Sequence, residues 1–369
     1  MEIVEKILDI DNAAVRDGLL ALPCPTEDVC FFDIETTGLS AQVSSVYLIG
    51  VIHIFEGKLK LVQWFADDYV SEKELLLHFT DYISGFQTLI HFNGNTFDVP
   101  YLRHKIQQHK IETTFPPHDH MDLYSYARHL RPYIHTANQK LTTMERLFGF
   151  VRNDTFSGKD CIQLYLDYMK MKFYKDRGTA AKKNQLLQHN RDDLLGTITC
   201  GNCLCYAMPE ILSYSEEYTE DAVLFSGKTS GTYKIPLQLE SPLGFSLCCD
   251  DRSCTAKVPL HKETLYHFFP DYKNYYYLPD EDMAIHKSIG TYVDSSHRKK
   301  ATASNCYVKQ QGTFFCIPAA FSPDSHTIFQ KGYKEKDRYL LQKEKQPETP
   351  LFTKEEGIEL LLAIHKEFF

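Results

Sequence analysis

The sequence predicts an α/β protein, in which a mixed β-sheet flanked by helices is followed by a second, β-rich domain. Three β-rich runs come first, at residues 29–34, 46–55 and 59–65, with Gly38 and Glu56-Gly57 as the turns between them. Helical periodicity interrupted by one short strand then continues to Met208 and stops after Pro209. At 369 residues the chain exceeds the ~250–300 residues that one hydrophobic core supports, so we expect two domains.

The first 26 residues are predicted to form a helical appendage. Ile3, Ile7 and Val15 recur at helical intervals over residues 2–20, and Pro23 then ends the pattern. The main domain is expected at residues 27–208 and a β-rich accessory domain of unknown role at 209–369.

Helix signals are strongest between the early strands and Pro209. Ser71-x-x-Glu74 has the capping-box pattern of a helix start, and a short strand follows at 88–92. Further helices are predicted at 97–108, 122–130, 141–148, 159–169 and 183–208. In the second domain, short strands are predicted at 222–225, 232–239, 245–249, 275–278 and 313–317, before a last helix at 353–365 that Thr353 and Glu356 should cap.

Charge and cysteine content limit the class of protein. A net charge of −9 and a pI near 6.0 argue against a protein that coats nucleic acid electrostatically, so any nucleic-acid contact should be local. The acidic start does not resemble a signal peptide, and no apolar run approaches the ~18 residues of a membrane span. Eleven scattered cysteines favour reduced thiols over a disulfide framework. We therefore expect a cytoplasmic location and no membrane partner.

Two carboxylates end the first predicted strand, in the segment Phe31-Phe32-Asp33-Ile34-Glu35-Thr36-Thr37-Gly38-Leu39. Residues i and i+2 of a strand project from the same face, so Asp33 and Glu35 should converge while Ile34 packs behind them. Carboxylates this close repel one another unless a cation lies between them. The motif therefore predicts half of a metal site.

Two further motifs supply acids on helices. The segment Asn93-Gly94-Asn95-Thr96-Phe97-Asp98 leads from a short strand through a turn into a helix whose first turn carries Asp98. In His189-Asn190-Arg191-Asp192-Asp193, His189 and Asp193 stand four residues apart and share one helix face, whereas Asp192 points about 100° away and is expected to be solvated.

These motifs resemble those of the DEDD 3′→5′ exonuclease superfamily. DIETTG matches the first motif, N-x-x-x-F-D-x-P-Y-L matches the second in the form seen in family B DNA polymerase proofreading domains, and H-x-x-x-D matches the histidine variant of the third. Within the superfamily the chain is most similar to YprB-type ribonuclease-H-like proteins, through Asp122-Leu123, Leu141 to Arg146, and Ser157-Gly158. The resemblance covers about residues 28–206 and implies a ribonuclease-H-like fold.

The resemblance also implies a two-metal-ion site. Asp33 would bridge two divalent ions, Glu35 and Asp193 would hold the first, and Asp98 would complete the second. Hard oxygen ligands select Mg²⁺ or Mn²⁺, and we expect no Cys or His among the four ligands. His189 is the candidate general base, with a helix-surface histidine as the alternative. The implied function is a 3′→5′ exonuclease acting on single-stranded DNA or RNA ends.

Candidate substrate contacts flank the motifs. In similar enzymes the residues after D-x-E hold the terminal nucleotide, and the asparagine of the second motif lies beside the single strand. The candidate contacts are therefore Thr36, Leu39, Asn93 and Phe97, although Leu39 and Phe97 could equally fill the core. Basic clusters could follow the phosphates or form solvated faces, and they occur at 103–105, 170–177 and 182–183.

Several alternatives stay open. A structure-selective endonuclease of the same fold fits the second motif less well, and a non-catalytic nucleic-acid-binding module would ordinarily lack one of the carboxylates. Cys200-x-x-Cys203-x-Cys205 lies within a predicted helix, which favours core packing over zinc. In the second domain, a zinc site could form from cysteines 248, 249, 254, 306 and 316 with histidines 261, 267 or 297. His297-Arg298-Lys299-Lys300 and the aromatic run 272–277 could grip nucleic acid, but a sheet core with a charged turn is slightly favoured.

Overall fold

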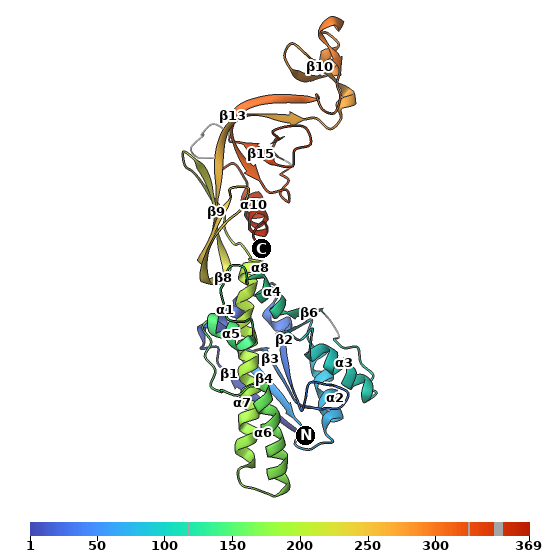
Figure 1. Cartoon of the computed structure of the whole chain (residues 1–369), viewed down its shortest axis with the longest axis vertical. Helices are drawn as coiled ribbons and strands as arrows, with labels where there is room; N and C mark the ends of the chain where they lie inside the picture. Colours follow the sequence, from blue (N-terminus) through green and yellow to red (C-terminus); the bar gives the residue numbers. More distant parts are fainter. Residues whose placement is uncertain (117–118, 324, 343–349) are drawn as a thin grey trace. The chain divides into compact units, whose positions relative to one another are not determined.

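The computed structural model describes residues 1–116, 119–323, 325–342 and 350–369. The chain divides into two compact units (Figure 1). The first comprises Met1–Glu210 and Ser230–Ile235, and the second comprises Ile211–Thr229 and Pro236–Phe369. Within the described part of the chain, no helix is both long and apolar enough to cross a membrane.

A six-stranded mixed sheet forms the centre of the first unit, in the order β1-β4-β3-β2-β5-β6. Strands β1, β4, β3 and β2 pair antiparallel, whereas β2, β5 and β6 run parallel. The strands span Glu2–Leu8 (β1), Val29–Thr36 (β2), Val46–Phe55 (β3), Lys58–Phe65 (β4), Thr88–His91 (β5) and Asp119–Asp122 (β6). Glu56, with a φ of 50°, and Gly57 form the tight turn that the sequence predicts between β3 and β4.

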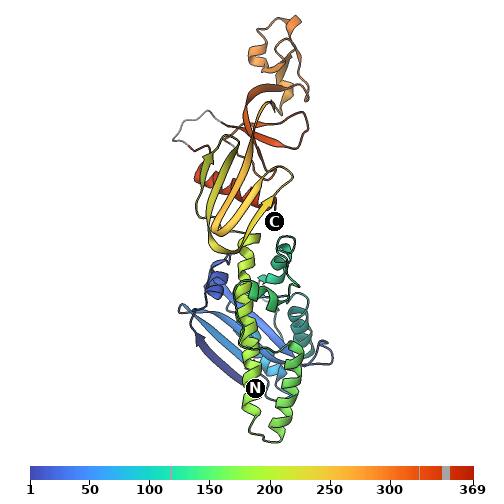
Figure 2. The ribbon, with the colours of Figure 1, turned by 60° about the vertical axis from the view of Figure 1, so that its left-hand side comes forward.

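Helices cover both faces of this sheet (Figures 1 and 2). They span Ala13–Leu20 (α1), Glu72–Ile83 (α2), Asp98–Gln108 (α3), Leu123–His129 (α4), Leu141–Leu147 (α5), Gly158–Phe173 (α6), Thr179–Cys200 (α7) and Leu204–Ala207 (α8). Phe32 of β2 contacts Phe79 of α2 on one face, with ring centroids 5.7 Å apart. On the opposite face, Gln63 of β4 donates a hydrogen bond to the Leu187 carbonyl of α7 (2.9 Å). The predicted α/β fold with a mixed, helix-flanked sheet is confirmed.

The prediction of one helix over residues 2–20 was wrong for the first part of that segment and is confirmed for Ala13–Leu20. Residues Glu2–Leu8 form β1, which pairs along its whole length with β4 at the edge of the sheet. Helix α1 begins only after Asn12, whose side chain accepts a hydrogen bond from the Ala14 amide (2.9 Å). The apolar spacing of residues 2–8 fits a half-exposed edge strand as well as a helix, and pairing with β4 decides between them.

Two helix predictions also need correction in detail. Ser71 does not form the capping box with Glu74, because its amide and hydroxyl both donate to Asp68 (2.8 Å each). The long helix expected at 183–208 ends at Cys200, and a 3₁₀ turn over Gly201–Cys203 separates it from α8. Gly201 packs so closely on Gly18 of α1 that an added Cβ would lie 2.5 Å from the Gly18 carbonyl oxygen.

The second unit is rich in β-structure, as the sequence predicted. Its six-stranded sheet has the order β14-β15-β13-β9-β8-β7, and a three-stranded sheet has the order β11-β10-β12. The strands span Ser215–Tyr218 (β7), Ala222–Glu240 (β8), Ser246–Phe268 (β9), Tyr275–Leu278 (β10), Met283–His286 (β11), Lys299–Lys300 (β12), Tyr307–Ile317 (β13), Ile328–Phe329 (β14) and Arg338–Leu341 (β15). The helices are Lys287–Gly290 (α9) and Lys354–Lys366 (α10), and Thr353 and Glu356 form the expected capping box of α10.

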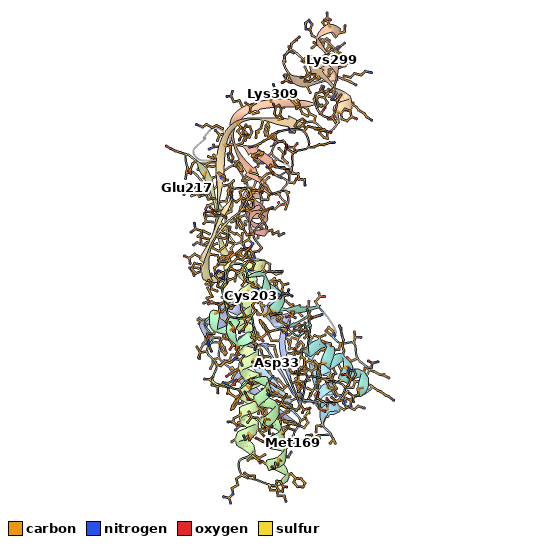
Figure 3. All side chains as sticks on the ribbon, viewed as in Figure 1. Asp33, Met169, Cys203, Glu217, Lys299 and Lys309 are labelled. Atoms are coloured by element: carbon orange, nitrogen blue, oxygen red, sulfur yellow. The ribbon has the colours of Figure 1, made fainter. Side chains whose placement is uncertain are left out.

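The aromatic run 272–277 packs within the second unit. Tyr275 stacks on Phe269 with ring centroids 4.6 Å apart, and the guanidinium of Arg298 lies 4.6 Å from the centre of the Tyr276 ring. Lys299 and Lys300 are exposed in β12, and Figure 3 shows the Lys299 side chain on that part of the chain. This arrangement agrees with the favoured interpretation of a sheet core beside a charged turn.

Candidate active site

Strand β2 directs two carboxylates toward helix α7. Asp33 Oδ2 accepts a hydrogen bond from Asn190 Nδ2 (2.8 Å), and Glu35 Oε1 lies 3.5 Å from His189 Nε2. Alternation along the strand sends Phe32 to the opposite face, where it packs on α2. Figure 3 shows Asp33 in the first unit where the sheet meets α7. The strand thus places two acids on one face, as the sequence predicted.

The acid of the third motif joins them. Oxygen atoms of Asp33, Glu35 and Asp193 all lie within 4.8 Å of one another. Asp98, the first residue of α3, is buried, and its charge helps to raise the pKa of Asp33. The structure therefore brings three of the four predicted carboxylates together from β2 and α7, and Asp98 lies near enough at the start of α3 for its charge to act on Asp33.

Crowding of these acids shifts their ionisation. Burial raises the pKa of Asp33 well above its ordinary value, and the charges of Asp193, Asp98 and Glu35 raise it further. Burial is also the main cause that raises the pKa of Glu35 and of Asp98. These raised pKa values indicate that the ionised carboxylates repel one another at a site where water does not fully stabilise their charges. A divalent cation would relieve that repulsion, and carboxylate oxygens are the ligands that Mg²⁺ and Mn²⁺ prefer.

Asn190 and Gly50 set the distance between α7 and the sheet. Gly50 of β3 pairs with Asp33 of β2, and a Cβ at Gly50 would lie 2.0 Å from Asn190 Oδ1. Asn190 Oδ1 accepts a hydrogen bond from Gln63 Nε2 (2.8 Å), so both ends of its amide are engaged. The missing side chain of Gly50 lets Asn190 approach closely enough to hold Asp33.

His189 is oriented by a residue that the sequence analysis missed. Its Nδ1 lies 3.1 Å from both carboxylate oxygens of Asp154, and its Nε2 faces Glu35 (3.5 Å) and Asp193 Oδ2 (3.4 Å). Because a carboxylate accepts, Nδ1 donates to Asp154, and Nε2 of the neutral ring carries the free lone pair. Burial lowers the pKa of His189, but the charges of Asp193, Glu35 and Asp154 outweigh it and raise the pKa overall. The histidine is buried, so the helix-surface alternative does not hold.

A buried arginine forms the second feature that sequence reasoning did not find. Arg152 Nη2 donates to Glu145 Oε2 (2.9 Å) and lies 2.5 Å from Asp193 Oδ1. Glu145 is buried in α5, and Gly196 of α7 leaves room for it, since a Cβ there would lie 2.1 Å from Glu145 Oε2. Arg152 therefore balances the charge of two carboxylates, one of which is a predicted metal ligand.

Asp192 is not solvated, contrary to the prediction. It is fully buried and accepts hydrogen bonds from the backbone amides of Asn153 (2.8 Å) and Asp154 (3.1 Å) and from Gln188 Nε2 (2.6 Å). The prediction assumed that one face of α7 meets solvent, but α5 and α6 also pack on this helix. Asp192 thus fixes the segment that carries Arg152 and Asp154.

The turn before Asp98 is held by Asp122. The two Asp122 oxygens accept hydrogen bonds from the amides of Asn93 (2.7 Å) and Asn95 (3.1 Å), and Asp122 also caps α4. Asn93 has a φ of 63°, a left-handed conformation that asparagine adopts more readily than most residues. Asp122 therefore determines how the chain enters α3 at Asp98.

The four predicted substrate contacts differ in accessibility. Leu39 is 84% exposed on the loop after β2, which excludes core packing for this residue. Thr36 is buried and donates to the Gly38 carbonyl (2.9 Å), so it shapes the same loop. Asn93 is partly exposed, and Phe97 is partly buried against Tyr101, with ring centroids 5.4 Å apart. Contact with substrate stays a prediction for all four.

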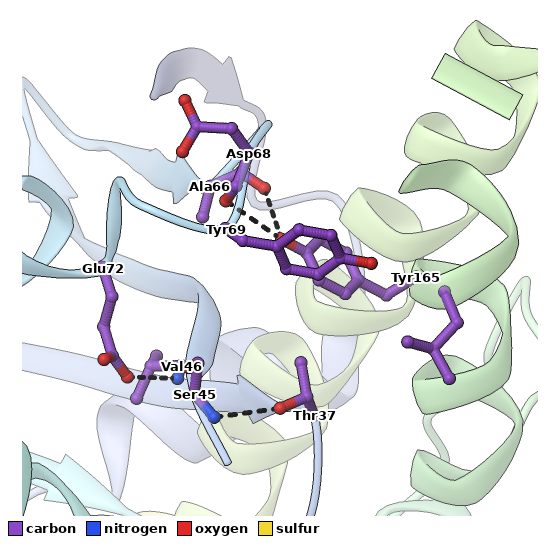
Figure 4. Close-up of a pocket in the computed structure, with 9 residues that line it drawn as sticks. Thr37, Ser45, Val46, Ala66, Asp68, Tyr69, Glu72 and Tyr165 are labelled. Carbon is purple, nitrogen blue, oxygen red and sulfur yellow. Dashed lines mark hydrogen bonds between the residues drawn. The ribbon is translucent and has the colours of Figure 1, made fainter. Parts of the chain in front are cut away.

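A pocket of about 230 Å³ adjoins the loop after β2 (Figure 4). Thr37, Ser45, Tyr69 and Tyr165 are among its lining residues, and Figure 4 shows the Tyr69 ring in front of Tyr165. Tyr165 stacks on Tyr47 (4.1 Å between ring centroids), and the Tyr47 hydroxyl donates to Glu35 Oε2 (3.4 Å). The pocket wall is thus linked to the acidic cluster through one aromatic pair.

The basic clusters contact protein groups. Lys105 is buried and pairs with Glu72 (3.4 Å), so its interpretation as a phosphate contact was wrong. Lys172 pairs with Asp67 (2.6 Å), and Lys182 lies 3.7 Å from Asp167. These lysines agree better with the alternative of structural or solvated charges.

A buried cysteine, Cys161, also lies beside the acidic site. Ligand atoms of Glu35, Cys161 and His189 lie within 4.8 Å of one another, and all three residues are buried. This cluster and the one formed by Asp33, Glu35 and Asp193 are the potential metal-binding groups found among the described residues. The cysteines at 200, 203 and 205 are buried thiols outside both groups, and the described cysteines and histidines of the second unit form no such group either.

Comparison with known proteins shows a superfamily similarity within this unit. A family model for the RNase H superfamily, RNase_H_2, matches residues 30–204. The matched residues include all five of the predicted catalytic residues. The family model does not test the YprB-type subgroup, which stays a prediction.

Comparison with whole proteins adds a distant similarity. No curated protein matches this chain. Among the solved structures that match is the family B DNA polymerase from the hyperthermophilic archaeon Pyrobaculum calidifontis, with 13% sequence identity and a TM-score of 0.39. That match covers 93% of this chain and 46% of the polymerase chain, so this chain spans less than half of the polymerase.

Proposed function

We propose that the RNase-H-like domain is a metal-dependent 3′→5′ exonuclease that hydrolyses phosphodiester bonds at the ends of single-stranded DNA or RNA. The observation that carries this proposal is a cluster of three carboxylates, two of which lie beside one buried histidine. Asp33, Glu35 and Asp193 lie within 4.8 Å of one another, and His189 Nε2 faces two of them. The superfamily match points to a nuclease in general, and the three motifs supply the exonuclease assignment.

The donor set fits two hard divalent ions, Mg²⁺ or Mn²⁺. Following the resemblance, Asp33 would bridge them, Glu35 and Asp193 would hold one, and Asp98 would complete the other. When bound, the ions supply Lewis-acid activation of water and stabilise the departing 3′ oxygen. The raised pKa of Asp33 agrees with this role, because bringing the acids together without a cation is unfavourable.

His189 would act as the general base. In the neutral ring Nδ1 donates to Asp154, and Nε2 then has the lone pair that can take the proton of the attacking water. The charge of Asp154 then stabilises the imidazolium that results. Asp154 is thus a positioning residue that acts through His189.

Substrate would lie beside the loop after β2. The exposed side chain of Leu39 could separate the terminal base from its neighbour, with Thr36, Asn93 and Phe97 beside it. The adjoining pocket presents the exposed ring of Tyr69, and aromatic rings stack on any base without sequence preference. We further propose a cytoplasmic site of action, which the free cysteines support.

The test uses purified protein with DNA and RNA single strands labelled at the 3′ or the 5′ end. With Mg²⁺ or Mn²⁺, we expect the 3′ label to be released as a mononucleotide and the 5′-labelled strand to shorten stepwise. Chelator and the Asp33→Asn variant serve as controls, and both should abolish cleavage. Internal fragments at the earliest times would favour the endonuclease alternative, and binding without cleavage would favour a non-catalytic module.

A further inference from the structure

The acidic site contains a second set of ligands whose chemistry differs from that of the four carboxylates. Cys161 lies in the first turn of α6, and its side chain is fully buried. Its Sγ lies within 4.8 Å of a Glu35 oxygen and of a His189 nitrogen. Thiolate, imidazole and carboxylate are the ligands that Zn²⁺ takes in proteins, whereas Mg²⁺ avoids sulfur.

The spacing of these ligands suits a small tetrahedral ion. Bonds of about 2.3 Å to sulfur and about 2.0 Å to nitrogen or oxygen place the ligand atoms of a tetrahedral site with one sulfur about 3.3–3.5 Å apart. Glu35 Oε1 and His189 Nε2 are 3.5 Å apart, within that range. Small side-chain adjustments would bring Cys161 into the same geometry, since its Sγ lies within 4.8 Å of a carboxylate oxygen of Glu35 and of a ring nitrogen of His189. Asp193 Oδ2, 3.4 Å from His189 Nε2, offers a fourth ligand atom.

An independent observation points to metal binding by His189. A histidine that binds zinc through one ring nitrogen usually donates the other N–H to a carboxylate, which fixes the ring and raises its basicity. Asp154 accepts from Nδ1 in this way (3.1 Å), leaving Nε2 directed at Glu35 and Asp193. The outer-shell partner that a zinc-bound histidine requires is therefore already in place.

We propose that Glu35, Cys161 and His189 form a binding site for Zn²⁺ inside the catalytic centre, and that zinc bound there inhibits the enzyme. Binding forms a zinc–sulfur bond, and the thiol proton passes to solvent. Zinc would occupy the lone pair of His189 Nε2 and an oxygen of Glu35, both of which cleavage needs. The inhibition rests on the proposed nuclease function, whereas the zinc site itself does not.

The binding test uses the full-length, reduced protein. Co²⁺ replaces Zn²⁺ as an optical probe, because a cobalt–thiolate bond gives a charge-transfer band in the near ultraviolet. We expect this band in the wild-type protein and in Cys30→Ala, which removes another buried thiol of the same domain. Cys161→Ala and Cys161→Ser should lose the band, and each should bind zinc more weakly by more than the ~10–100-fold typical of losing an outer-shell partner.

Two variants at position 161 keep the test decisive if one of them fails to fold, which far-ultraviolet circular dichroism would show. Equal cobalt spectra and equal zinc affinity in the wild-type protein and a folded Cys161 variant would overturn the proposed site. A His189→Gln variant should also lose zinc affinity, and unchanged affinity in that variant would overturn the site as well.

The inhibition test adds Zn²⁺ to reactions that contain excess Mg²⁺, and each protein is compared with its own rate without zinc. Zinc should inhibit the wild-type protein and Cys30→Ala at concentrations that leave the Cys161 variants uninhibited. Equal inhibition of all variants would show that zinc acts through the carboxylates alone and would overturn the inhibitory role. If no nuclease activity is found but the cobalt band depends on Cys161, the zinc site stands and the proposed function fails.

Discussion

Replacement of Asp192 by alanine should damage both the stability of the first unit and its active site, although Asp192 is not expected to touch metal or substrate. The buried carboxylate accepts two backbone N–H groups, from Asn153 and Asp154, and the side-chain amide of Gln188. Alanine would leave these three donors without that acceptor in the protein interior. Each buried donor left unpaired costs about 1–3 kcal/mol.

Part of this loss is offset, because the buried carboxylate is itself unfavourable. Burial raises the pKa of Asp192, and the Asn153 and Asp154 amides oppose that rise only partly. We therefore expect Asp192→Ala to lower the free energy of unfolding by about 3 kcal/mol. For a unit of this size, that corresponds to a drop of roughly 6–12 °C in Tm.

Asp192→Asn is the matched control. An asparagine carbonyl oxygen can accept from the two backbone amides, and the Gln188 amide can rotate to present its oxygen to the new NH₂ group. Thermal unfolding gives the overall effect, and hydrogen exchange at the Asn153 and Asp154 amides reports the local one. Exchange should accelerate in Asp192→Ala and change little in Asp192→Asn. An alanine variant with wild-type Tm and wild-type exchange at both amides would refute this account of Asp192.

Three further predictions follow from the charged groups of the site. In Asp33→Asn, cleavage should be lost while the metal-free protein becomes more stable at pH 8, because the folded-state pKa of Asp33 is raised. In the wild-type protein, the stability that comes from protonated Asp33 is complete below the unfolded pKa of about 3.9 and is lost as pH rises through the folded pKa. The difference in unfolding free energy between the variant and the wild-type protein, measured in chelator, should therefore widen from pH 5 to pH 8. A difference that stays constant over this range would contradict the prediction. In His189→Ala, turnover should fall by ~10²–10⁴-fold, and the residual rate should rise with pH. The affinity for Mg²⁺, measured by calorimetry, should barely change. A wild-type rate in this variant would exclude the general-base role. In Arg152→Met, chemical denaturation should show that the free energy of unfolding falls by about 3–5 kcal/mol, because Glu145 keeps a buried charge without its partner. Adding Glu145→Gln should restore much of this stability. If it does not, Arg152 acts mainly through other contacts.

The four carboxylates could be predicted from the sequence because each motif is local. Alternation along one strand aligns Asp33 with Glu35, and a four-residue helical spacing aligns His189 with Asp193. The resemblance then related the motifs to one another. Helix and strand geometry was therefore enough to align the residues within the first and third motifs, and the resemblance was needed to bring the motifs into one site.

The supporting groups could not be predicted in this way, because their partners are distant in sequence. Asp154 lies 35 residues before His189, in a segment without helix or strand periodicity. The only hint of Asp154 in the sequence was its position just before Ser157-Gly158, a pair that had been noted only as a feature shared with the YprB-type proteins. Cys161 was missed because a cysteine within an apolar helix face is indistinguishable from core packing until α6 meets β2.

The arrangement of α7 restricts how its sequence can change. Within five consecutive residues, Asn190 contacts Asp33, His189 contacts Asp154, Asp192 holds the segment before α6, and Asp193 joins the acidic cluster. These contacts point in different directions around the helix axis, so one extra residue between His189 and Asp193 would rotate the later ones by about 100° and separate them from their partners. An insertion near Thr179, where the helix begins, would leave these relationships untouched. In related proteins, insertions and deletions in this helix should therefore occur in its first turns, and none should occur between His189 and Asp193.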